Sequence, residues 1–181
     1  EKNMRSGHVW HLHIWWARRP WGACRAVELA ALLPDPMDPK CPEEFVDTAS
    51  NIMRSLRYSI QKEERNRDLQ KALLHFIGEY AEWQKGTVSF YRSAAQSLMK
   101  AAHPESQPVL IDSFSGNGAI PGEALRLGCD SIAVDINPVA TLILKAILEY
   151  IPKHGEKLLD IYRKGSRHIK DEAKLRMAEY Y

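Results

Sequence analysis

The stretch PVLIDSFSGNGAIPGEALRLGCDSIAVDINP, residues 108–138, decides how the rest of the chain is interpreted. It begins with the short apolar run Val109–Ile111, which predicts a strand buried on both faces. Gly116 and Gly118 follow directly, and two glycines at this spacing predict a turn that can adopt positive φ angles and approach a ligand closely. The stretch therefore opens as a strand that leads into a glycine turn.

A helix, a second strand and a carboxylate complete the unit. Pro121 fits the first turn of a helix, where its missing N–H is tolerated, and Gly128 can end that helix. Ser131–Val134 predicts a second buried strand, with Asp135 at its carboxyl end. Ligands of open α/β sheets bind at the carboxyl ends of the strands. We therefore expect the glycine turn and Asp135 to face one crevice.

The details of the turn separate two kinds of nucleotide-like ligand. A nicotinamide dinucleotide favours Gly-x-Gly-x-x-Gly, and here Pro121 stands in place of the third glycine. The run Asp112-Ser-Phe-Ser-Gly-Asn-Gly118 instead resembles the Asp-Pro-Phe-x-Gly-x-Gly turn of DNA amino-methyltransferases, with Ser113 where proline is usual. Those enzymes are class I methyltransferases that use S-adenosylmethionine. The alternative is an ordinary strand–helix–strand turn that binds no ligand.

The resemblance implies a role for each part of the turn. In the family the glycine turn wraps the methionine portion of the cofactor, and the acid after the second strand accepts hydrogen bonds from both ribose hydroxyls. Asp135-Ile-Asn-Pro138 is similar to the family's acidic loop. The residues of this stretch that the resemblance assigns to S-adenosylmethionine binding are Asp112, Phe114, Ser115, Gly116, Gly118, Asp135, Ile136 and Asn137.

The first residues of the chain mix basic, aromatic and histidine side chains. Residues 1–27 contain four of the five tryptophans and several arginines. Such a mixture can contact phosphates and stack on bases, or it can form a buried aromatic cluster whose arginines reach solvent. His8, His11 and His13 lie among the tryptophans, and without a third ligand nearby in sequence they do not predict a metal site.

One block in this region carries a second resemblance. His13-Ile-Trp-Trp-Ala-Arg-Arg-Pro20 is similar to the opening of a family of predicted DNA methylases that begin with a domain of unknown function. By that resemblance Arg19 and Pro20 would lie near the methionine end of the cofactor, and Trp16 and Arg18 would guide DNA. The alternative is that the block caps the edge of the sheet and binds nothing.

The remaining segments are predicted to be mostly helical. A helix over residues 25–33 ends at a proline-rich loop, and 43–100 follows as a helical region whose clearest apolar stripe lies between Leu69 and Ala81. A helix over 89–102 precedes the first strand. After the acidic loop, Asn137 can cap a helix over 139–150 that Pro152 ends. A last helix over 154–181 is expected to pack through Leu158, Leu159, Tyr162, Ile169, Ala173 and Met177.

Composition agrees with a globular protein. The 181 residues are 45% hydrophobic and 27% charged, and a formal net charge of +2 excludes no partner class. The three cysteines are scattered, which predicts neither a disulfide framework nor a zinc site. No apolar run is long enough to span a membrane, and no signal peptide is visible, so we expect a cytoplasmic location with reduced thiols.

The expected catalytic loop is missing from this sequence. DNA amino-methyltransferases use an Asn/Asp-Pro-Pro-Tyr/Phe loop, whereas Asn137-Pro138 continues with Val139 and belongs to the acidic loop.

We expect a partial Rossmann-like α/β fold with a large helical N-terminal part, divided as 1–33, 34–104 and 105–181. The catalytic residues stay unknown, and a downstream catalytic half or a partner subunit would supply them. The chain would then be a fragment of an enzyme that methylates DNA at an exocyclic nitrogen, adenine N6 being the expected target. The alternative is a non-catalytic nucleic-acid-binding or assembly module.

Overall fold

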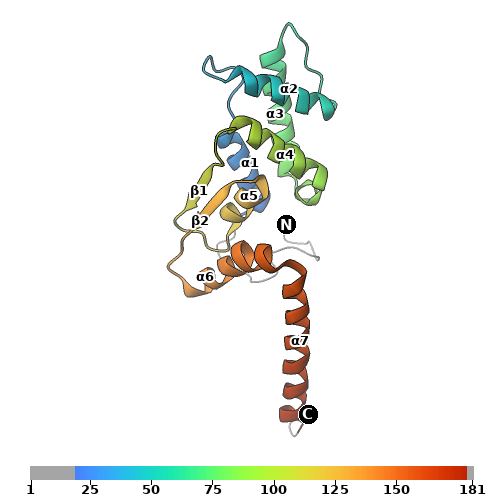
Figure 1. Cartoon of the computed structure of the whole chain (residues 1–181), viewed down its shortest axis with the longest axis vertical. Helices are drawn as coiled ribbons and strands as arrows, with labels where there is room; N and C mark the ends of the chain where they lie inside the picture. Colours follow the sequence, from blue (N-terminus) through green and yellow to red (C-terminus); the bar gives the residue numbers. More distant parts are fainter. Residues whose placement is uncertain (1–18, 179–181) are drawn as a thin grey trace.

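The structure is a computed structural model, and it describes residues 19–178. Its helices are α1 (Trp21–Leu32), α2 (Glu43–Ser55), α3 (Arg65–Ala81), α4 (Ser89–Ala102), α5 (Ala119–Leu127), α6 (Pro138–Leu144) and α7 (Ile151–Met177), with a 3₁₀ turn η2 (Lys85–Thr87) and a π-helical stretch η3 (Lys145–Tyr150). The strands β1 (Val109–Asp112) and β2 (Asp130–Ala133) form a parallel sheet (Figure 1). The described chain is thus mostly helical with a small α/β unit.

Helices α1 to α4 enclose the main hydrophobic core. The predicted stripe of α3 is confirmed, because Leu69, Leu73, Phe76 and Tyr80 are all buried. Phe76 and Tyr80 stack on Tyr91 of α4, with ring centroids 6.0 and 6.2 Å away. The α4 bounds also agree with the prediction. This core gives the strand–turn unit a rigid base.

Helix α1 joins the helical core to the sheet. It packs against α3 and α4 on one side and against α5 on the other, and α5 in turn packs against both strands. Figure 1 shows α1 and α5 lying together between the upper helices and the sheet. The α1 helix begins earlier than predicted, because Trp21 is buried against Gly122 of α5 rather than left in the lead-in segment.

The two strands lie side by side in register, with Ile111 opposite Ile132. Alternate side chains of a strand point to opposite faces of the sheet. On one face Val109 and Ile111 are 57% and 64% exposed, and Ile132 and Val134 are each 51% exposed. The prediction that both strands are buried on both faces is therefore wrong for residues 19–178. Helix α5 covers one face, and an apolar run in the sequence cannot show whether the second face is covered too.

The C-terminal helices also depart from the prediction. Asn137 caps α6 by accepting a hydrogen bond from the Val139 N–H at 2.9 Å, as expected. Pro152 does not end the helix, because it lies in the first turn of α7, and the backbone breaks instead at Gly155 (φ 49°, ψ −128°). No residue of α7 is buried, so the described chain does not cover its expected inner face. Figure 1 shows α7 projecting away from the rest of the molecule.

Candidate functional site

The turn between β1 and α5 has the backbone geometry that its glycines predict. Gly116 and Gly118 have φ angles of 52° and 77°, in the left-handed region that favours glycine. Asp112 holds the start of the turn, since its Oδ1 accepts from the Phe114 N–H at 3.1 Å and its carbonyl accepts from the Ser115 hydroxyl at 2.9 Å. The Gly118 N–H closes the turn on the Ser115 carbonyl at 2.8 Å. The turn is therefore preorganised by its own hydrogen bonds.

Asp135 connects the ends of the two strands. Its Oδ2 accepts a hydrogen bond from the Gly116 N–H at 2.8 Å, and its Oδ1 accepts one from the Asn137 N–H at 2.8 Å. A backbone bond from the Ser115 N–H to the Val134 carbonyl at 3.0 Å runs beside them. The glycine turn and the acid of the second strand thus lie on the same side of the sheet and in direct contact.

A small pocket opens at this junction. It measures about 130 Å³, and its lining includes six of the predicted residues: Arg19, Asp112, Phe114, Ser115, Gly116 and Asp135. Whole small-molecule sites usually measure about 300–1,000 Å³, so this pocket can enclose only part of a cofactor-sized ligand. Phe114 is 85% exposed beside it, which leaves an apolar ring available at the rim.

The other predicted residues lie outside that pocket. Gly118 is buried beneath Leu144, whose Cδ2 would lie 2.9 Å from a Cβ at that position. Asn137 is occupied as the cap of α6, and Pro20 lines a neighbouring pocket. Ile136 is 99% exposed. Trp16 and Arg18, assigned to DNA, lie outside the described residues, as do His8, His11 and His13.

A buried ion pair that the sequence did not reveal supports the turn. Arg25 of α1 donates to both carboxylate oxygens of Glu123 of α5, at 2.8 and 3.0 Å, and both side chains are buried. Arg25 also donates to the Tyr80 carbonyl and lies over the Tyr80 ring, 4.5 Å from its centroid. Gly86 allows this arrangement, because a Cβ there would lie 2.2 Å from the guanidinium nitrogens.

This ion pair fixes the helix that follows the turn. Because α5 begins at Ala119, directly after Gly118, anchoring Glu123 to α1 also positions the glycine turn. The sequence did not reveal this pair, because isolated charged residues are expected at the surface and because the two partners are 98 residues apart. The available signal was an arginine and a glutamate, each inside a mostly apolar helix.

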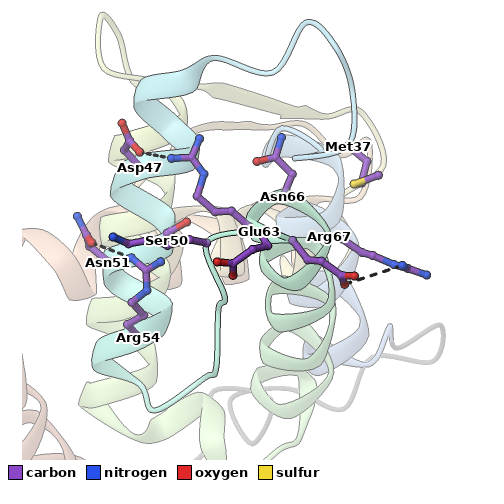
Figure 2. Close-up of a pocket in the computed structure, with 11 residues that line it drawn as sticks. Met37, Asp47, Ser50, Asn51, Arg54, Glu63, Asn66 and Arg67 are labelled. Carbon is purple, nitrogen blue, oxygen red and sulfur yellow. Dashed lines mark hydrogen bonds and ion pairs between the residues drawn. The ribbon is translucent and has the colours of Figure 1, made fainter.

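A larger hollow lies elsewhere, between α2 and α3 (Figure 2). It measures about 1,000 Å³ and is lined by polar side chains. Several of its charges are paired with one another or with nearby groups: Arg65 pairs with Glu43 and Asp47, and Arg67 lies 3.9 Å from Glu64. This open basin therefore adds no candidate residue to the site.

Metal binding has no support in the part of the chain that the structure describes. There, no three His, Cys, Asp or Glu side chains are grouped so that they could hold a metal ion. Cys24, Cys41 and Cys129 are all free thiols. Between residues 19 and 178 no helix has the length and apolar character that crossing a bilayer requires.

Comparisons with known proteins give one match. Residues 1–69 match the model of a family described as "Protein of unknown function (DUF1156)". No curated protein and no solved structure matches the chain. The matched segment includes α1 and α2 and ends within α3, so the glycine turn and Asp135 lie outside it.

Proposed function

We propose that this chain binds S-adenosylmethionine at the junction of β1 and β2, in a Rossmann-like arrangement, and serves as the cofactor-binding portion of a DNA amino-methyltransferase. The observation that carries the proposal is the 2.8 Å hydrogen bond from the Gly116 N–H to Asp135. It brings together a glycine turn and an acid at the carboxyl ends of two parallel strands, where ligands of α/β sheets bind.

The groups at this junction fit the cofactor chemically. A carboxylate has about four acceptor positions, and backbone N–H groups occupy two of those of Asp135. The remaining positions would accept hydrogen bonds from the two ribose hydroxyls. Arg19 lines the same pocket with an always-charged guanidinium, which suits the carboxylate of the methionine portion. Phe114 and Ile136 are exposed nearby and would cover the apolar parts of the ligand.

The bound cofactor would supply a methyl group on a sulfonium centre, ready for transfer to a nucleophile. The part of this chain in that reaction is to bind and orient, because the Asn/Asp-Pro-Pro-Tyr/Phe loop that grips a flipped base is not in the sequence. DNA as substrate and adenine N6 as target rest on the resemblance of the turn and of the block before Trp21. The property to test in this chain is therefore binding rather than turnover.

Ile136 offers the sharpest test of the site. Its side chain is 99% exposed, so shortening it leaves the fold unchanged. Burying an isoleucine side chain against a ligand is worth about 1.5–3 kcal/mol, and Ile136→Ala should weaken S-adenosylmethionine binding by about tenfold in calorimetry. Ile161→Ala, at an exposed isoleucine of α7, is the matched control and should bind as the wild type does.

Asp135→Asn, compared with Asp130→Asn at the opposite end of β2, tests the acid. Loss of charge-assisted bonds of about 1.5–3 kcal/mol each should weaken binding more than tenfold in the first variant only. If the wild-type chain binds no S-adenosylmethionine at millimolar concentration, the proposal fails. Salt-dependent DNA binding that the cofactor does not affect would then favour the nucleic-acid-binding module.

A further inference from the structure

A second pocket lies on the α1 side of the sheet and contains a buried carboxyl group. It measures about 390 Å³, within the range of about 300–1,000 Å³ that is usual for small-molecule sites. Its lining comes from α1, the two residues before it, β1 and α5: Arg19, Pro20, Ala23, Cys24, Val27, Glu28, Ala31, Leu32, Leu110 and Ile120. The wall is almost entirely apolar.

Arg19, which is exposed, and Glu28, which is buried, are the charged residues of that lining. The Glu28 side chain is only 5% exposed, and neither carboxyl oxygen has a hydrogen-bond partner among the described residues. A buried polar group without a partner costs about 1–3 kcal/mol, and most buried polar groups in proteins are paired. The nearby Arg25 does not satisfy it, because that guanidinium is committed to Glu123 and to the Tyr80 carbonyl. An unpaired carboxyl in an apolar pocket of ligand size indicates a missing polar partner.

The surroundings of Glu28 keep it protonated at neutral pH. Burial, together with the charges of Glu123 of α5 and Asp112 of β1, raises its pKa to about 8, and Arg25 on its own helix offsets part of the increase. The neighbouring thiols of Cys24 and Cys129, whose own pKa values are raised to about 11, stay neutral. A protonated carboxyl offers one O–H donor and one carbonyl acceptor side by side.

We propose that this Glu28 pocket binds a neutral ligand with an apolar body and a planar edge that presents a hydrogen-bond donor beside an acceptor. An amino-substituted nitrogen ring such as adenine has such an edge, and so does a primary carboxamide. Both carboxyl oxygens lie beneath the pocket wall in this structure, so the Glu28 side chain has to turn toward the pocket when a ligand binds. Either ligand would then form two parallel hydrogen bonds with the carboxyl group while its body fills the apolar space. The site does not depend on S-adenosylmethionine binding, although Arg19 and Ile120 line both pockets.

Two pairs of probes test the proposal and distinguish the sources of the edge. Adenine is compared with N6,N6-dimethyladenine, and benzamide with N,N-dimethylbenzamide, by ligand-observed NMR titration of the whole chain. In each pair methylation removes the donor and leaves the acceptor. We expect the parent compound of at least one pair to bind more than tenfold tighter than its dimethyl partner, and the pair that shows this identifies the source. Equal binding within both pairs overturns the proposal.

The pH dependence of probe binding in Glu28 variants tests the proposal, because a purely structural role of Glu28 would not change it. Glu28→Gln keeps a donor beside an acceptor but does not titrate, so it should bind the preferred probe at all pH values. Wild-type affinity should fall about tenfold between pH 7 and pH 9, as the protonated fraction of a group with a pKa near 8 falls. Glu28→Leu removes both hydrogen bonds and should bind the probe at least tenfold more weakly.

The Ile136→Ala variant separates this site from the proposed cofactor site, and it should bind the probes as the wild type does. Probe affinity that is unaffected by Glu28→Leu, or that does not change with pH in the wild type, overturns the assignment. Failure of S-adenosylmethionine to bind would leave these results unchanged.

Discussion

Because the carboxyl of Glu28 is buried and unpaired, we expect the free energy of unfolding to fall as the pH rises. Paired carboxylates have the opposite effect. The pKa of Glu28 is raised from 4.5 to about 8 in the folded state. Between those values the folded chain binds a proton that the unfolded chain has lost, so the free energy of unfolding falls as the pH rises. Each unit of pKa shift corresponds to about 1.4 kcal/mol, and the whole shift to roughly 5 kcal/mol. The stabilisation is complete below pH 4.5 and is lost by about pH 8.

Glu28→Gln isolates this contribution, because the amide has nearly the same shape and does not titrate. Urea unfolding followed by circular dichroism at pH 4.5, 6, 7 and 8.5 gives the free energy of unfolding of both proteins. We expect the variant to gain stability relative to the wild type steadily across this range, by several kcal/mol in total. Glu44→Gln, at an exposed position of α2, controls for the removal of one carboxylate. A difference between Glu28→Gln and wild type that stays constant with pH would refute the reasoning.

Three further substitutions test the packing that supports the turn, each by urea unfolding at pH 7. Arg25→Met should destabilise the fold by about 3 kcal/mol, because it removes both hydrogen bonds of Arg25 to the buried Glu123 and leaves only the partly exposed Arg126 beside that carboxylate. Adding Glu123→Leu should recover most of the loss, and equal stability of the single and double variants would contradict this. Gly86→Ala should cost about 1–3 kcal/mol, since its Cβ would collide with the Arg25 guanidinium, and it should cost nothing when Arg25 is already methionine. Phe76→Ala should cost about 3–5 kcal/mol by opening a cavity in the core, and a loss below 1 kcal/mol would show that the helices repack.

Features that depend on local patterns were predictable from the sequence. The stripe of α3 and the bounds of α4 follow from helical periodicity. The glycine turn could be placed because only certain residues adopt positive φ angles, and the Asn137 cap because its side chain bonds to a nearby backbone group. Each of these signals lies within a few residues of the structure that it predicts.

Features that depend on distant partners were not predictable in this way. The apolar runs of the strands and the stripe of α7 indicate surfaces that can be buried, but what covers them is decided by other parts of the structure. Arg25, Glu28 and Glu123 present the opposite difficulty. Each is charged in its ordinary state and would be expected at the surface. Arg25 and Glu123 are buried because they pair with each other across 98 residues. Burial of Glu28 depends on its pKa, which only the folded environment sets.

These three residues also bear on how the matched segment relates to the proposed cofactor site. Residues 1–69 contain Arg25 and Glu28, whereas Glu123 and the glycine turn lie beyond them. The Arg25–Glu123 pair is enclosed, so separating the two parts would take the carboxylate partner from Arg25. Helix α1 therefore contributes to both sites. It packs against α5, the helix after the glycine turn, and it lines the Glu28 pocket. A piece that ends near residue 69 would lose the partner of Arg25 and the β1 side of that pocket, and we expect such a piece to be unstable unless both are restored.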